Sequence, residues 1–181
     1  MNNSLYEKDK CMNSDHVATP RWVVEDIYSL INVKVFNSIW LPFNNYDSEF
    51  KTKAEELNLK YKATHIFDDV GSDFFITEPP KNCDLMISNP PFSQQNDILE
   101  RSFELIDQEA IKSFALLLPL ATLETEKRAT IFQAYNDKLS ILIFKKRIKF
   151  IGHTTSFNRG CCWICYNIDA LQEKRIQWVR N

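Results

Sequence analysis

The sequence predicts an α/β domain whose mostly parallel sheet is doubly wound, with helices covering both faces. Short apolar runs of strand length alternate along the chain with longer segments whose apolar residues recur at helical spacing. Strands that alternate with helices pair in parallel, because each helix carries the chain back across the sheet. The last two extended runs have no helix between them, which favours an antiparallel pair at one edge. A chain of 181 residues is an ordinary size for one domain.

Four helices are expected. The first begins at Thr19-Pro20, with threonine as the N-cap and proline as the first helical residue. Its apolar residues follow at helical spacing: Val23, Val24, Ile27, Leu30 and Ile31. Asp47 or Ser48 is expected to cap a second helix, and the apolar pattern predicts two more around residues 98–106 and 125–135.

The predicted strands share an apolar run bounded by polar or turn-forming residues. They are Val35–Phe43, Thr64–Phe67, Cys83–Ser88, Ser113–Leu120, Leu139–Phe144, Arg147–Ile151 and Gly160–Ile168, with a brief segment at Asp73–Ile76. Ligands bind such sheets beyond the carboxyl ends of the strands, where the strand order reverses. The loops 42–48, 68–75 and 88–94 are therefore expected to surround one crevice.

Composition excludes several classes of protein. Three glycines are too few for a dinucleotide-binding fingerprint or a P-loop. No signal peptide or long apolar segment is evident, so a soluble, cytoplasmic protein without a membrane partner is expected. Residues 1–15 are polar and predicted as a flexible leader, with one domain over 16–181. The cluster Cys161, Cys162 and Cys165 lacks a second ligand pair, so it favours a buried strand over zinc, and no metal is expected.

The segment Asn89-Pro90-Pro91-Phe92 carries the most specific chemical signal. It follows a buried strand, and its two prolines stiffen the turn and leave backbone carbonyls free to accept hydrogen bonds. The Asn89 side-chain oxygen and the Pro90 carbonyl would hold both hydrogens of an exocyclic amino group and direct its lone pair at an electrophile. Phe92 would stack on a base turned out of its helix. A turn with only a structural role remains the alternative.

This segment resembles motif IV, Asn/Asp-Pro-Pro-Tyr/Phe, of the N6-adenine and related amino methyltransferases. Further stretches are similar to other motifs of that family and of its small bacteriophage and prophage members. The resemblance implies a Rossmann-like class I methyltransferase fold, S-adenosylmethionine as cofactor, and Asn89, Pro90, Pro91 and Phe92 as catalytic residues. The cofactor-binding residues that it implies are Thr19 and Pro20 (motif X), Pro42 and Phe43 (motif I), Asp68 or Asp69 (the ribose-binding acid), and Asp73 and Phe74 (motif III).

The loop that resembles motif I lacks the family's glycines. Asn44 and Asn45 in this loop can adopt left-handed backbone conformations. Because of this departure, a non-catalytic relative that keeps the fold as a binding module is an alternative to an enzyme. A methyltransferase for RNA or for a protein glutamine is a further alternative to one for DNA.

Few residues follow the predicted core, so no separate target-recognition domain is expected. Nucleic acid, DNA before RNA, is the expected partner, although the formal net charge is −2. The basic run of Lys145, Lys146, Arg147 and Lys149, together with the loop after it, would form a modest rim for phosphates. The substrate-binding candidates in this rim are Lys149, His153, Phe157, Asn158 and Arg159.

Overall fold

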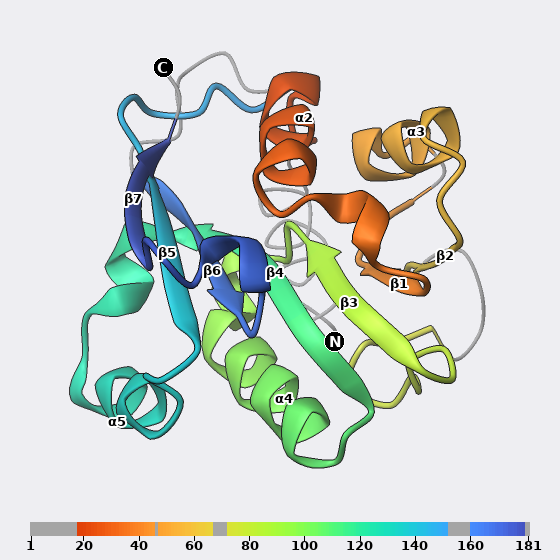
Figure 1. Cartoon of the computed structure of the whole chain (residues 1–181). Helices are drawn as coiled ribbons and strands as arrows, with labels where there is room; N and C mark the ends of the chain where they lie inside the picture. The colour runs from red at the N-terminus through yellow and green to blue at the C-terminus, as the bar shows by residue number, and fades with distance from the viewer. Residues whose placement is uncertain (1–17, 46, 67–71, 152–159, 180–181) are drawn as a thin grey trace, which may run out of the picture.

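Seven strands form one sheet in the order β2-β1-β3-β4-β6-β5-β7 in the described part of the chain (Figure 1). The computed structural model describes residues 18–45, 47–66, 72–151 and 160–179. The strands are β1 (Ile39–Pro42), β2 (Tyr61–Thr64), β3 (Cys83–Ser88), β4 (Ile111–Pro119), β5 (Leu139–Phe144), β6 (Cys161–Tyr166) and β7 (Ile176–Val179). Neighbouring strands are parallel except where β6 lies antiparallel between β4 and β5. The mostly parallel α/β sheet predicted from the sequence is confirmed.

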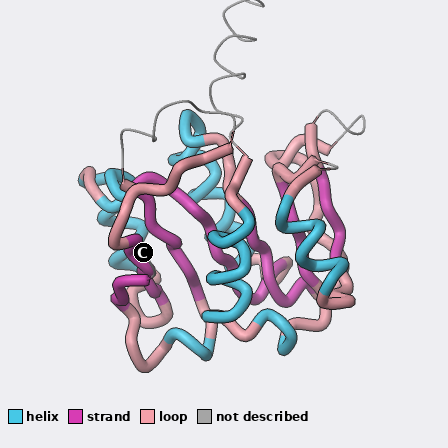
Figure 2. The backbone as a smooth tube through the Cα atoms, turned by 90° about the horizontal axis from the view of Figure 1, so that it is seen from above, coloured by secondary structure: helices cyan, strands magenta, loops and turns pink. Residues whose placement is uncertain are grey.

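Helices cover both faces of the sheet (Figure 2). Helices α2 (Arg21–Leu30) and α3 (Glu49–Glu56) pack on one face, and α4 (Gln95–Asp107) and α5 (Glu126–Ala134) on the other. Four short 3-10 helices complete the described elements: η1 (Val33–Val35), η2 (Phe92–Gln94), η3 (Leu120–Leu123) and η4 (Asp169–Leu171). None of the helices in the described ranges combines the length and apolarity needed to span a bilayer.

Alternating strand residues fill the two cores. Leu85 and Ile87 pack against α2 and α3, whereas Met86 between them faces α4. Because these strands are buried on both faces, they read as continuous apolar runs in the sequence. The same alternation in β6 places Trp163 in the core beneath α2 and α3, and Ile164 in the core beneath α4 and α5.

Several element boundaries differ from the sequence prediction. Helix α2 begins at Arg21, so Pro20 is its N-cap and the hydroxyl of Thr19 is free to bond elsewhere. Strand β2 ends at Thr64, where the predicted strand begins. The segment 73–76 is a turn that is tied by hydrogen bonds to the backbone carbonyl of Asp73.

The C-terminal part of the sheet also differs in detail. The antiparallel partners of β6 are β4 and β5, whereas residues 147–151 contribute a single bridge, from Ile151 to Ala18. Strand β7 was not predicted. It adds a parallel edge strand whose Ile176 and Trp178 are both more than 60% exposed. A short edge strand whose alternate residues are exposed lacks the apolar pattern by which buried strands are predicted.

The described cysteines are buried thiols. Cys161 and Cys165 face one side of β6, and Cys162 faces the other. Among the described residues, no group of His, Cys, Asp or Glu is arranged to hold a metal ion. Burial raises the pKa of Cys83, Cys161 and Cys162 to about 12 and raises that of Cys165 as well.

These thiols should resist alkylation in the folded protein. An ordinary cysteine has a pKa of about 8.5 and is partly thiolate at pH 8, whereas a thiol with a raised pKa stays protonated. Iodoacetamide at pH 8 should therefore leave Cys83 and the β6 cysteines unmodified until guanidinium unfolds the chain, as read by peptide mass spectrometry. Rapid labelling of a β6 cysteine in the native protein would contradict their burial.

Candidate functional site

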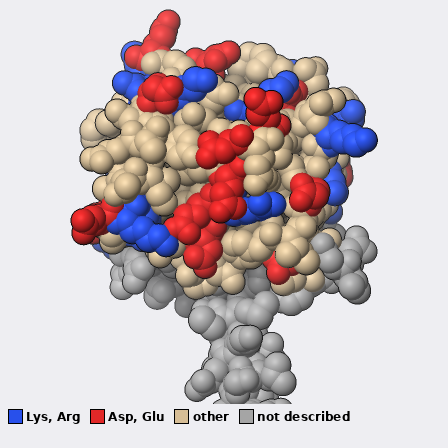
Figure 3. Space-filling view, turned by 90° about the horizontal axis from the view of Figure 1, so that it is seen from below, with Lys and Arg blue, Asp and Glu red and all other residues tan. Residues whose placement is uncertain are grey.

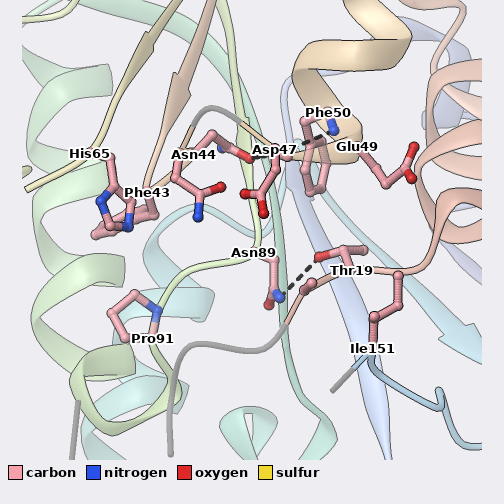
Figure 4. A pocket seen from close by; sticks show the side chains of 13 residues that line it. Thr19, Phe43, Asn44, Asp47, Glu49, Phe50, His65, Asn89, Pro91 and Ile151 are labelled. Carbon is pink, nitrogen blue, oxygen red and sulfur yellow. Dashed lines mark hydrogen bonds between the residues drawn. The ribbon is translucent and has the colours of Figure 1, made fainter. Parts of the chain in front are cut away.

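A cavity of about 470 Å³ lies at the carboxyl ends of β1 and β3 (Figure 4). These strands are parallel neighbours, and β2 pairs on the far side of β1, so the strand order reverses here. Both the position and the volume are usual for a small-molecule site in this kind of sheet. The lining residues are Ala18, Thr19, Phe43, Asn44, Asn45, Asp47, Ser48, Glu49, Phe50, His65, Asn89, Pro91 and Ile151.

The loop after β1 is held by the buried side chain of Asn44. Its Nδ2 donates to the Pro42 carbonyl at 2.7 Å and to Ser88 Oγ at 3.0 Å, which ties the end of β1 to the end of β3. Its Oδ1 accepts from the hydroxyl of Ser48, and Ser48 Oγ in turn accepts from the Phe50 amide at 3.2 Å as the N-cap of α3. The predicted Ser48 cap is thus confirmed, and one amide rigidifies this wall of the cavity.

Phe43, and neither Asn44 nor Asn45, adopts the left-handed backbone conformation in this loop, with φ of 62°. Neither asparagine uses the left-handed conformation that its side chain permits. The chain turns immediately after β1, which allows the Asn44 side chain to reach back to the Pro42 carbonyl. The Phe43 ring packs on Phe74 at 4.8 Å between centroids, and Phe74 stacks on Trp40 in the core. This packing holds a conformation that is uncommon for a bulky residue.

Asn89 stands at the opposite wall, directly after β3. Its Nδ2 donates to Thr19 Oγ1 at 3.0 Å, a contact between residues far apart in the sequence (Figure 4). Thr19 is buried, and its neighbour Ala18 accepts a hydrogen bond from the Ile151 amide at 3.0 Å. The segment before α2 thereby orients the Asn89 side chain with its NH₂ group toward Thr19.

The rest of the diproline segment surrounds this corner. Pro91 lines the cavity in an extended conformation, whereas Pro90 is buried and not part of the lining. Phe92 begins η2 and meets Phe150 edge to face, with ring centroids 6.2 Å apart. Asn89 and Pro91 therefore open on the cavity, and Phe92 lies behind them.

The cofactor-binding candidates divide into three groups. Thr19 and Phe43 line the cavity, and the carbonyl of Pro42 anchors its loop. Three candidates lie outside the lining: Pro20, Asp73 and Phe74. Pro20 caps α2, and Phe74 supports Phe43 from the core. Asp73 Oδ1 accepts a hydrogen bond from the Phe75 amide at 3.0 Å. Asp68 and Asp69 lie outside the described residues.

Sequence reasoning missed His65, Glu49, Phe50 and Ile151 as cavity residues, whereas Asp47 lies in the loop 42–48 that was expected to border the crevice. His65 follows β2 directly and is buried, so the expected strand histidine is a loop residue beside Phe43. The position of a polar residue just after a strand was the available signal, but the shifted boundary of β2 concealed it.

Solved structures of similar fold were found, although no protein-family model matches the sequence and no curated protein is detectably similar to it. A Listeria monocytogenes protein described as a class I S-adenosylmethionine-dependent methyltransferase superposes with a TM-score of 0.60 at 17% identity, over 91% of this chain. This chain has the class I methyltransferase fold. A protein from Vibrio vulnificus described as a modification subunit of a type I restriction enzyme superposes with a TM-score of 0.56 at 16% identity, over 91% of this chain. This chain spans 66% of the first protein and 47% of the second.

In this methyltransferase fold, the charges that line the cavity are negative. Asp47 directs a carboxylate into the cavity, the side chain of Glu49 at its edge turns toward α2, and neither lysine nor arginine is found among the described lining residues. A cationic ligand is therefore favoured here, and a phosphate is disfavoured.

The basic run follows β5 and leads to Ile151 in the cavity wall. Lys145, Lys146, Arg147 and Lys149 are exposed, whereas Ile148 and Phe150 between them are buried. On the face seen from below relative to Figure 1, acidic side chains gather near the centre with basic ones around them (Figure 3). Of the predicted substrate-binding residues, Lys149 is exposed and precedes the lining residue Ile151 by two positions, and His153, Phe157, Asn158 and Arg159 lie outside the described residues.

Proposed function

We propose that this protein is an S-adenosylmethionine-dependent methyltransferase that modifies an exocyclic amino nitrogen, N6 of adenine in DNA. One observation carries the proposal: Asn89, oriented by Thr19, opens at a stiff diproline corner onto a cavity at the topological switch point. A neutral amide and a proline carbonyl suit a neutral NH₂ group, which needs acceptors rather than a strong base.

The cavity fits the cofactor in volume, charge and lining. Its volume of about 470 Å³ is within the usual range for small ligands. Phe43 offers aromatic surface to an adenine ring, with Phe50 buried in the wall, and the carboxylate of Asp47 suits a molecule with a sulfonium and an ammonium group. Thr19, Asn44 and Asn45 add uncharged polar groups, so Thr19 and Phe43 are proposed as cofactor contacts, with Pro42 supporting the loop.

When bound, S-adenosylmethionine would supply an electrophilic methyl group. Asn89 and the Pro90 carbonyl would accept the two amino hydrogens and aim the nitrogen lone pair into the cavity. Pro91 would keep this corner stiff, so that positioning supplies most of the acceleration. Phe92, held by Phe150, would support the base or the corner from behind.

Two observations favour a nucleic acid as the substrate. The exposed basic run ends at the cavity wall, where its side chains would contact phosphates beside an inserted base. The fold is also shared with the Vibrio vulnificus modification subunit, described as part of a restriction enzyme, which favours DNA over RNA. Lys149 is the proposed phosphate contact among the described candidates.

Two measurements test the proposal. Titration calorimetry should detect binding of both S-adenosylmethionine and S-adenosylhomocysteine by the purified chain. Mass spectrometry of nucleosides should find N6-methyladenine enriched in DNA from a host that expresses the protein, relative to a host with Asn89→Ala. Binding without any methylated nucleoside would indicate a non-catalytic module, methylation of RNA or glutamine would correct the substrate, and absence of binding at millimolar cofactor would refute the proposal.

A further inference from the structure

Asp47 places a carboxylate in the cavity without a basic partner among the described residues. It lies on the loop between β1 and α3, and its side chain points into the cavity toward Asn89 (Figure 4). No ion pair within the described part of the chain involves Asp47. Within the described ranges, no basic side chain balances its negative charge, so that charge is available to a cationic ligand.

Glu49, the other acidic lining residue, is arranged differently. Its side chain turns away from the cavity toward α2, where Glu49 Oε2 lies 3.9 Å from Arg21 Nη1 (Figure 4). Arg21 also contacts Glu56 at 2.6 Å and Glu25 at 3.0 Å, so Glu49 shares the positive charge of Arg21 with two other carboxylates. Two acids two residues apart thus face different surroundings, and one of them provides an internal control for the other.

We propose that Asp47 makes the cavity selective for the charge of its ligand, so that the cationic methyl donor binds in preference to its neutral demethylated product. This inference rests on the proposed function, because it concerns the same cavity. S-adenosylmethionine and S-adenosylhomocysteine differ by one methyl group and by the positive charge on sulfur. A carboxylate that faces the corner where transfer would occur attracts the sulfonium and has no such attraction for the thioether.

The consequence is a bias toward product release. Loss of the methyl group removes the charge on sulfur, and with it the attraction to Asp47. The demethylated product would then leave more readily than if the cavity were neutral, and a fresh donor would replace it. The effect is modest because Asp47 is solvent-exposed and its field is screened by water and salt.

The test is the ratio of the dissociation constants of the two ligands, measured by titration calorimetry for the wild type, Asp47→Asn and Glu49→Gln. The wild type should bind S-adenosylmethionine more tightly than S-adenosylhomocysteine, and Asp47→Asn should reduce this preference about fivefold. Glu49→Gln should keep the wild-type ratio. Thermal unfolding without ligand checks that both variants are folded.

Salt separates the effect of charge from that of methyl contact. Raising sodium chloride from 50 to 500 mM should lower the preference in the wild type and leave it nearly constant in Asp47→Asn. An equal ratio in the wild type and Asp47→Asn, or an equal loss in Glu49→Gln, would overturn this inference while leaving the proposed function intact. Binding of neither ligand by the wild type would instead refute the proposed function.

Discussion

An Asn89→Ala variant should lose methyl transfer by at least about a hundredfold while still binding the cofactor. The alanine removes the side-chain acceptor for the amino group but leaves the cavity walls formed by Phe43, Asn44 and Phe50. The variant also loses the hydrogen bond from Nδ2 to Thr19, which should weaken binding of S-adenosylhomocysteine by no more than about tenfold. Transfer of a radiolabelled methyl group to host DNA and calorimetry measure the two effects separately.

Two further variants sharpen this prediction. Asn89→Asp keeps oxygen acceptors at the corner and should retain more activity than the alanine variant. Gln94→Ala changes an exposed side chain of η2 just beyond the motif and should behave as the wild type. If Asn89→Ala kept activity within about threefold of the wild type, Asn89 would be a structural turn residue and the proposed mechanism would be wrong.

The sequence predicts the central strands well because burial on both faces leaves a continuous apolar run. Strands β3 and β5 have the predicted bounds, and each stops where polar residues begin. Strand β2 is misplaced because it lies at the sheet edge, where Thr64 alone is buried. Its position is set by pairing with β1, a tertiary contact with no counterpart in the local pattern.

The corner of the candidate site and the loops beside it were predicted from the sequence, but the side chains that meet there were not. Asn89 carries a stiff, unusual local sequence, so it could be singled out without knowing its neighbours. Its partner Thr19 was expected to cap a helix, but the N-cap is Pro20, and the hydroxyl turns to Asn89 instead. His65 and Asp47 lie in loops, where apolar periodicity is silent and the path of the chain decides which side chains meet.

Arg128, a buried arginine that no sequence pattern singles out, should have a large effect on stability. Arg128 is 8% exposed on α5, and its guanidinium donates only to neutral acceptors in the described part of the chain. Nε donates to the carbonyls of Thr122 and Glu124 at 2.7 and 3.0 Å, and Nη2 to the carbonyl of Ala121 at 2.9 Å. Nη1 donates to Asn96 Oδ1 at 2.7 Å, which joins η3 and α5 to the first turn of α4.

Arg128→Met should lower the free energy of unfolding by about 3 kcal/mol, because methionine fills similar space but leaves these buried acceptors without their donors. Arg128→Lys should recover only part of the loss, since an ammonium group cannot reproduce the planar fork.

Lys127→Met is the matched control: Lys127 pairs with Glu100 on the surface, and its loss should leave the urea midpoint nearly unchanged. Urea unfolding with a constant slope would assign the difference to the native state. Equal midpoints for Arg128→Met and Lys127→Met would show that apolar contacts hold α5 and η3, and that the hydrogen bonds of Arg128 are dispensable.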